Sequence, residues 1–321
     1  GLVHQYFNIM RIFPPRSFPP AMTLADIHHI HKFHMSLEET SARISELRQQ
    51  VLPNQRTEEW YRTRYNMLTA SNIYKALGSE AQYNSLICEK CKDFVGNIGG
   101  TEYVNTNLST HWGEKYEPMS AKVYERLFPD CIVDTTFGCI THPTYGFLGA
   151  SPDGVVVSGS RIGHMVEIKN RVSREINGIP SLAYWVQTQM QMEVCGLEFC
   201  DLFETCFKEF PNETAFYENQ ELYDYRGVIL YFVDKHAPGI PLYSYLDPIG
   251  VDMGIEESKK LVESWIKVIK ESPRMEGKIL MEIQYWYLEE MSCVVIPRNR
   301  EWFQSALPTF QKLWTLSLIH I

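Results

Sequence analysis

The sequence predicts an α/β fold in which a mixed central β-sheet is flanked by helices and preceded by an N-terminal helical extension. Residues 164–169 alternate in polarity and residues 227–233 (GVILYFV) form a buried β-branched run, and both patterns are typical of strands. Apolar residues recur at helical spacing over residues 255–269. Shorter patterns predict a strand at 293–296 and a final helix at 302–314. The 321 residues are 45% hydrophobic and 21% charged, which indicates one large globular domain or two small ones.

Charge and cysteine content indicate which partners and which cellular compartment to expect. The net charge of −9 argues against indiscriminate coating of nucleic acid, but it allows a few local cations to contact phosphate. The eight irregularly spaced cysteines do not resemble a secreted disulfide scaffold. No apolar run approaches membrane-spanning length, and the opening GLVHQYFNIMRIF lacks a signal-peptide layout. We therefore expect an intracellular protein that has no membrane partner.

The predicted extension covers residues 1–56 and begins with an arm. Residues 1–22 contain RIFPPRSFPPAM, a proline-rich stretch typical of extended chain. Thr23 is expected to cap a helix through HHIHKFH. The side chains that share one face of this helix are His28, His31 and His34. Because no acidic or cysteine partner is nearby, a solvated or packing face is favoured over a metal site.

A second helix of the extension opens at Ser36, where Ser36-Leu37-Glu38-Glu39 forms a capping box. Ile44, Leu47 and Val51 give it a narrow apolar stripe, and Pro53 is expected to end it.

The core domain is predicted to cover residues 57–321, with Thr57 capping its first helix. Arg64 lies seven positions before Ser71, which is expected to cap the helix NIYKAL that ends at Gly78. A guanidinium beside a helix N-terminus is suited to holding a phosphate. The alternative is a surface arginine and a routine cap.

A lone CxxC follows at Cys88 and Cys91. Zinc or an iron–sulfur cluster needs two more ligands, for which Cys131, Cys139 and His142 are the candidates. The spacing alone leaves metal binding at this position open.

A helix is expected from Trp112 through MSAKVYERLF, with Met119, Val123 and Leu127 facing the core. Glu114 or Glu117 at its start is a candidate for an active site. Acidic residues are also favoured at helix N-termini for their charge alone, so this alternative stays open.

Residues 147–157 and 164–169 predict two strands joined by the turn Ser158-Gly159-Ser160-Arg161. If the turn is centred on Ser160, Asp153 lies opposite Glu167, and two facing carboxylates repel unless a cation lies between them. A divalent metal with Lys169 beside it suits phosphodiester hydrolysis. The alternative is a surface hairpin that carries an ordinary Glu–Lys pair.

The segment from Ser181 to Cys195 is expected to be a helix. Gln187 and Gln191 lie one turn apart on it, so both side chains are expected to point inward. A glutamine on an apolar helix usually makes a satisfied polar contact, which is the alternative to a functional role.

These motifs together resemble a known family. Ser151-Pro152-Asp153-Gly154 followed by Glu167-Ile168-Lys169 resembles the signature of the PD-(D/E)xK nuclease superfamily. The pattern W-x₃-R-x₄-TAS, from Trp60 to Ser71, is similar to the opening of the phage lambda exonuclease and YqaJ-like viral recombinase family. The resemblance covers about residues 60–200. It implies a restriction-endonuclease-like fold for residues 57–321 and a Mg²⁺-dependent exonuclease, with Mn²⁺ as a substitute cofactor.

The same resemblance implies residue roles and partners. The roles it assigns are metal binding by Asp153, Glu167, Glu117 and the Ile168 carbonyl, catalysis by Lys169 and Gln187, and 5′-phosphate binding by Arg64 and Ser71. The substrate would be double-stranded DNA ends, digested 5′→3′ to leave 3′ tails for recombination. Partners would be a single-strand annealing protein and further copies of the chain in a ring of three. A viral source would place the protein in the host cytoplasm or nucleus.

Two other functions remain open. One is a structure-specific endonuclease on the same fold, and the other is a non-catalytic DNA-end-binding subunit. The complete set of Asp153, Glu167 and Lys169 speaks against the second, because a binding subunit has no need for all three.

Overall fold

The computed structural model describes residues 35–94, 103–173 and 175–319. The predicted arm at 1–22 and the helix expected after Thr23, with His28, His31 and His34, lie outside the described residues. The helices are α3 (Leu37–Gln49), α4 (Glu58–Tyr65), η1 (Ile73–Leu77), α5 (Glu80–Cys91), α6 (Ser109–Leu127), α7 (Leu182–Cys195), α8 (Glu213–Glu218), η2 (Gln220–Leu222), α9 (Ile255–Glu271), η3 (Pro273–Met275) and α10 (Arg300–Ile319). The strands are β1 (Leu68–Thr69), β2 (Ile132–Asp134), β3 (Ile140–Thr141), β4 (Leu148–Ala150), β5 (Gly154–Ser158), β6 (His164–Asn170), β7 (Phe199–Glu209), β8 (Tyr225–Asp234), β9 (Ala237–Tyr245), β10 (Ile249–Gly250) and β11 (Lys278–Pro297).

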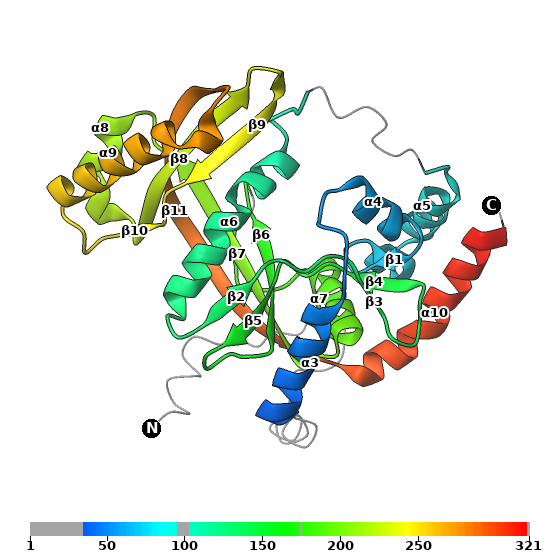
Figure 1. Cartoon of the computed structure of the whole chain (residues 1–321). Helices are drawn as coiled ribbons and strands as arrows, with labels where there is room; N and C mark the ends of the chain where they lie inside the picture. Colours follow the sequence, from blue (N-terminus) through cyan, green and yellow to red (C-terminus); the bar gives the residue numbers. More distant parts are fainter. Residues whose placement is uncertain (1–34, 95–102, 174, 320–321) are drawn as a thin grey trace.

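An eight-stranded sheet runs through the centre of the molecule (Figure 1), in the order β10-β8-β11-β7-β6-β5-β2 with β9 also paired to β8. Strands β6 and β7 are parallel, whereas the other neighbouring strands are antiparallel. The sheet is therefore mixed, as predicted. The strand expected at 293–296 is only the end of β11, which is 20 residues long and pairs with both β7 and β8.

Helices cover both faces of this sheet. α6 packs on one face, where its Met119 and Val123 share a buried cluster with Val166 of β6. α7 packs on the other face, where its Met190 shares a cluster with Met165. Because neighbouring residues of a strand point to opposite faces, these two contacts place β6 between the two helices. The α/β prediction is confirmed.

A smaller sheet of order β1-β4-β3 lies beside α4, α5 and α10 (Figure 1). This arrangement corrects the expectation of a single strand over residues 147–157. The segment divides into β4 in the small sheet and β5 in the large one, separated by Ser151-Pro152-Asp153. Proline has no backbone N–H to donate to a sheet ladder, which explains the break at this point.

The extension helix α3 begins at Ser36 with the predicted capping box. Ile44 and Leu47 are buried against the core, but the helix ends at Gln49. The expectation that Val51 continues the apolar stripe is wrong, since this side chain lies beyond the helix and is 99% exposed. The start expected at Trp112 was also late, because α6 begins at Ser109.

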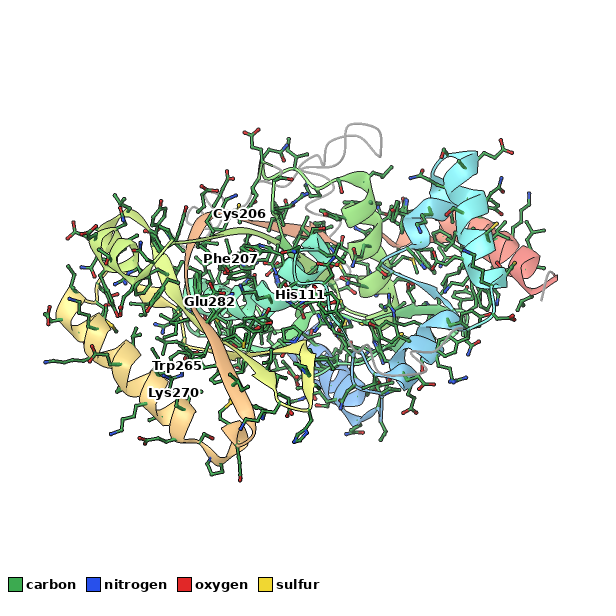
Figure 2. All side chains as sticks on the ribbon, turned by 90° about the horizontal axis from the view of Figure 1, so that it is seen from above. His111, Cys206, Phe207, Trp265, Lys270 and Glu282 are labelled. Carbon is green, nitrogen blue, oxygen red and sulfur yellow. The ribbon has the colours of Figure 1, made fainter. Side chains whose placement is uncertain are left out.

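The C-terminal half supplies its own layer, in which α8 and α9 cover the distal part of β8 and β11. Trp265 and Ile266 of α9 pack into a cluster with Leu230 of β8, as the helical spacing predicted. Figure 2 shows Trp265 and Lys270 on α9 well away from His111 on α6. Among the described residues, no helix is both long and apolar enough to span a membrane.

Candidate active site

The β5–β6 hairpin has the register expected for a turn centred on Ser160. Gly154 pairs with Val166 and Val155 with Met165, so the next position places Asp153 beside Glu167. Asp153 lies just before β5, and its Oδ2 accepts a hydrogen bond of 2.8 Å from the backbone N–H of Ile168. The short connection between the strands therefore fixes the two carboxylates at one end of the hairpin.

Three donors hold the carboxylate of Glu167, which is only 2% exposed. Gln187 Nε2 donates to Oε1 at 2.7 Å, and Gln191 Nε2 donates to Oε2 at 2.5 Å. Lys169 Nζ lies 2.5 Å from Oε1. The predicted helix that carries both glutamines is α7, which begins at Leu182 and has Ser181 as its cap. Gln191 has no role in the family resemblance, but its spacing of four from Gln187 was the signal that the two share a face.

Glu117 of α6 approaches the same end of the hairpin. Its Oε2 accepts a 2.7 Å hydrogen bond from Arg56 Nη2, whereas Glu114 lies farther from that arginine, with 3.9 Å between Oε1 and Nε. Burial, and to a smaller extent the charge of Glu167, raises the pKa of Glu117. Sequence reasoning missed Arg56 because its partner is 61 positions away.

The acidic groups are short of positive charge. Burial, followed by the charges of Glu167 and Glu117, raises the pKa of Asp153 well above its ordinary value. Lys169 and the Ile168 N–H oppose this shift without cancelling it. Burial raises the pKa of Glu117 as well, although Arg56 opposes it. The site thus holds carboxylates that an additional cation would stabilise.

The donor set fits a hard divalent cation, although its side chains are not yet gathered around one point. In the described ranges, no three His, Cys, Asp or Glu side chains are arranged as a ready metal cage. Asp153, Glu167 and the Ile168 carbonyl offer oxygen ligands, which Mg²⁺ prefers. An ionised carboxylate has about four lone-pair sites, so Glu167 can keep its two glutamine donors and still bind a metal.

A second cluster surrounds Arg64 at the end of α4, the helix that Thr57 caps as predicted. Arg64 Nη2 donates to Ser71 Oγ at 2.9 Å, and Nη1 donates to Ser151 Oγ at 3.3 Å. The guanidinium lies over the Trp60 ring, with 4.3 Å between Cζ and the ring centroid. Trp60 Nε1 also donates to Ser151 Oγ, at 3.1 Å. Arg64 and Ser71 therefore meet, and Ser151 joins them, a contact for which the sequence carried no signal.

The role of Ser71 as a helix cap is wrong. The helix that follows is the short 3₁₀ helix η1, its N-cap residue is Asn72, and no side chain caps it. The hydroxyl of Ser71 bonds to Arg64 instead, and Thr69 Oγ1 lies 3.3 Å from it. The cluster offers a guanidinium and hydroxyls rather than a capped helix start.

The CxxC cysteines lie at the end of α5, where Cys88 is exposed. Cys91 donates to the Ser317 carbonyl at 3.6 Å. Cys131 and Cys139 are buried, and across residues 35–94, 103–173 and 175–319 no metal-ligand group of three includes them.

Residues 59–198 match the family model of the YqaJ-like viral recombinase domain. The resemblance predicted from the motifs is confirmed. This YqaJ-like region contains both clusters around Arg64 and Glu167, but it stops short of β7 and the C-terminal layer. Arg56 also lies outside it.

Other similarities are more distant. An uncharacterized protein of Acanthamoeba polyphaga mimivirus is 25% identical over 302 residues, which cover 83% of this chain and 53% of that protein. The chain thus spans about half the length of that relative. An alkaline exonuclease from Laribacter hongkongensis is 21% identical, covers 67% of this chain and all of its own, and has a TM-score of 0.37. A phage-related exonuclease from Haemophilus somnus is 12% identical, with 79% and 92% covered and a TM-score of 0.39. Because these scores are low, the fold assignment rests on the sheets and helices described above.

Proposed function

We propose that this chain is a metal-dependent deoxyribonuclease that digests double-stranded DNA ends in the 5′→3′ direction. The observation that carries the proposal is the meeting of Asp153, Glu167 and Lys169 at one end of the β5–β6 hairpin. Two carboxylates with a lysine beside them are the groups that metal-assisted phosphodiester hydrolysis requires. The match to a viral recombinase domain supports the same assignment.

Asp153, Glu167 and the Ile168 carbonyl would hold Mg²⁺, with Glu117 in support and Mn²⁺ as a substitute. Bound metal lowers the pKa of a coordinated water and stabilises charge that develops on the phosphate. Gln187 and Gln191 each donate to one oxygen of the Glu167 carboxylate and so hold it in one orientation.

Lys169 acts as a charged donor in this proposal. Burial by itself favours loss of its proton, but the nearby carboxylates of Glu167 and Asp153 outweigh burial and raise the pKa of Lys169 above its ordinary value. A protonated amine at neutral pH can orient a water through hydrogen bonds and stabilise negative charge as it develops. It is not suited to removing a proton from that water.

The cluster at Arg64 would set the polarity of digestion. A terminal phosphate carries more negative charge than an internal diester, so its charge-assisted hydrogen bonds to a guanidinium are stronger. Ser71, Thr69 and Ser151 surround Arg64 with hydroxyls that can donate to the same phosphate oxygens. A 5′-phosphorylated end should therefore be preferred over a 5′-hydroxyl end.

The direct test is digestion of end-labelled linear duplex with Mg²⁺ and with chelator. We expect release of 5′ nucleotides only with metal, and faster initial rates on a 5′-phosphorylated duplex. Arg64→Ala should slow the phosphorylated substrate far more than the hydroxyl one. Arg62→Ala is the matched control, because Arg62 is also on α4 but is exposed and pairs with Glu58.

Three results would contradict the proposal. Cleavage of covalently closed circles at a similar rate would indicate a structure-specific endonuclease instead. Binding to DNA ends without hydrolysis would indicate the non-catalytic subunit. Equal slowing of both ends by Arg64→Ala would make Arg64 a general backbone contact.

The proposal includes assembly with an annealing protein and a ring of three subunits, as the family resemblance implies. Light scattering at working concentration checks the ring. A monomer that digests DNA distributively would remove this part of the proposal and leave the nuclease assignment intact.

A further inference from the structure

The linker between α3 and α4 passes the carboxylate cluster in a strained conformation. Arg56 has a φ of +66°, and it is the one non-glycine residue with a positive φ within the described ranges. In this left-handed region the Cβ of an L-residue crowds its own backbone. Such a conformation persists only where surrounding contacts hold it, and strain of this kind gathers at functional sites.

Contacts on both sides of Arg56 hold the linker in place. Gln55 Nε2 donates to the Phe137 carbonyl at 2.9 Å and to the Pro152 carbonyl at 3.2 Å. Pro152 directly precedes Asp153, so Gln55 ties the linker to the loop that carries a candidate metal ligand. Gly138 leaves the room for this approach, since a Cβ there would lie 2.4 Å from the Pro53 carbonyl oxygen.

The guanidinium of Arg56 contacts the acidic cluster at Glu117. Arg56 Nη2 lies 2.7 Å from Glu117 Oε2, and the two side chains are 44% and 30% exposed. This hydrogen bond uses Oε2 and leaves Oε1 of Glu117 available as a ligand. Arg56 Nε also lies 3.9 Å from Glu114 Oε1, so one guanidinium faces both acids at the start of α6.

We propose that Arg56 is a positioning residue of the metal site, which the N-terminal extension supplies to the YqaJ-like region. It holds Glu117 by Oε2, which leaves Oε1 free to bind the metal that Asp153 and Glu167 would hold. This inference rests on the proposed function, because it concerns the same site. It also gives the segment between α3 and Thr57 a direct part in the active site.

Two effects on metal affinity oppose each other. The positive charge of Arg56 repels a divalent cation, whereas the orientation of Glu117 favours one. Because the guanidinium is substantially exposed, solvent and salt screen its repulsion. The hydrogen bond to Glu117 is directional and is not replaced by water in the same geometry. We therefore expect orientation to outweigh repulsion.

The experiment measures Mn²⁺ binding to the full chain by titration calorimetry without DNA. Arg56→Ala and Arg56→Gly should each weaken Mn²⁺ affinity by about tenfold or more, the scale for removing a partner of a metal ligand. Arg56→Lys should restore part of that loss. Arg48→Ala is the matched control, because Arg48 also joins the extension to the core through a carboxylate, Asp134, at 2.9 Å. Its effect on Mn²⁺ affinity should stay within about twofold, because Asp134 is not a candidate metal ligand and Arg48 itself is 55% exposed.

Arg56→Gly separates strain from charge, since glycine adopts a positive φ without crowding. Its thermal unfolding temperature should equal or exceed that of the parent while its Mn²⁺ affinity falls. Unchanged or tighter Mn²⁺ binding by both Arg56→Ala and Arg56→Gly would overturn the inference, and tighter binding would mean that Arg56 competes with the metal. An equal loss in Arg48→Ala would also overturn it, because docking of the extension would then be the cause. If the parent shows no Mn²⁺ binding that Asp153→Ala removes, the proposed function itself fails.

Discussion

Two buried carboxylate clusters lie along strand β6 and differ in how their charge is balanced. At its start, Asp201 of β7 receives hydrogen bonds from Arg161 Nη2 at 2.8 Å and from Tyr124 at 2.5 Å, and its Oδ1 lies 2.9 Å from His164 Nδ1. Although Asp201 is fully buried, His164, Arg161 and Tyr124 outweigh the effect of burial and lower its pKa. In the candidate active site, by contrast, burial raises the pKa of Asp153.

The opposite pKa shifts distinguish a structural carboxylate, Asp201, from a candidate functional one, Asp153. Asp201 has as many donors as its oxygens require, so the folded chain satisfies it completely. Asp153 has the Ile168 N–H and faces two other acids. We therefore expect a cation to bind at Asp153 and not at Asp201.

The largest effect should follow from removing a candidate metal ligand. Asp153→Ala or Glu167→Ala should reduce digestion to the background rate, because each change removes an oxygen ligand from the metal, and chelator should do the same to the parent. Initial rates of label release measure this, with circular dichroism to confirm that each variant is folded. Turnover close to that of the parent in either variant would exclude the assignment of these ligands.

Breaking the other cluster should affect stability instead. Asp201→Asn leaves Arg161 and His164 buried beside a neutral amide, and breaking one partner of a buried pair costs about 3–5 kcal/mol of unfolding free energy. Urea denaturation measures the loss. The rate of digestion per folded molecule should stay unchanged. If stability is unaffected and activity is lost, the functional contrast between the two clusters is wrong.

Lys169→Ala tests whether the lysine of the acidic cluster contributes to hydrolysis itself. Removing a donor that stabilises developing charge should slow hydrolysis by about a hundredfold, while DNA binding persists. Lys208→Ala is the control, because Lys208 lies on the neighbouring strand, is partly exposed and pairs with Glu289. Single-turnover rates and a separate DNA-binding measurement distinguish the two variants. Loss of binding with an unchanged single-turnover rate would make Lys169 a DNA contact.

The smallest expected effect is on the pH dependence of stability without metal. Because the pKa of Asp153 is raised in the folded state, the folded chain holds more protons than the unfolded chain between the ordinary pKa and the raised one. Stability therefore falls as pH rises through that window. Asp153→Asn removes this titration, so the variant should gain stability relative to the parent as pH increases.

Thermal unfolding in chelator from pH 4 to pH 8 measures that difference. Added Mg²⁺ should stabilise the parent and leave Asp153→Asn unaffected, as linkage to a bound ligand requires. A parent that gains stability relative to the variant with rising pH would show that Asp153 is already satisfied, like Asp201.

Short-range features of the sequence predicted much of the site. The β5–β6 register followed from the position of a short turn, and it brought Asp153 beside Glu167 as expected. The spacing of Gln187 and Gln191 placed both side chains on the same carboxylate. The register was predictable because both carboxylates belong to one hairpin, and the shared face was predictable because both glutamines belong to one helix. That this face meets Glu167 depends on the packing of α7 against β6.

Predictions failed where a local sequence pattern was compatible with two different structures. Ser71 precedes a helical turn and has a capping side chain, but Arg64 takes its hydroxyl and Asn72 occupies the cap position. Residues 147–157 read as one strand on either side of Pro152, but the proline breaks the ladder and the two parts join different sheets. For Ser71, a tertiary contact outweighed a local preference.

The sequence by itself determined the hairpin, the helix that carries the glutamines and the order of the motifs. Tertiary structure alone decided that Arg56 reaches Glu117 and that Ser151 joins Arg64. Arg56 meets Glu117 across 61 positions, and Arg64 meets Ser151 across 87. The physical reason is that these contacts arise when the linker and α4 pack against loops from the distant sheets. Packing between separate segments leaves no periodic pattern in either segment. The sequence of each segment therefore does not predict such a contact.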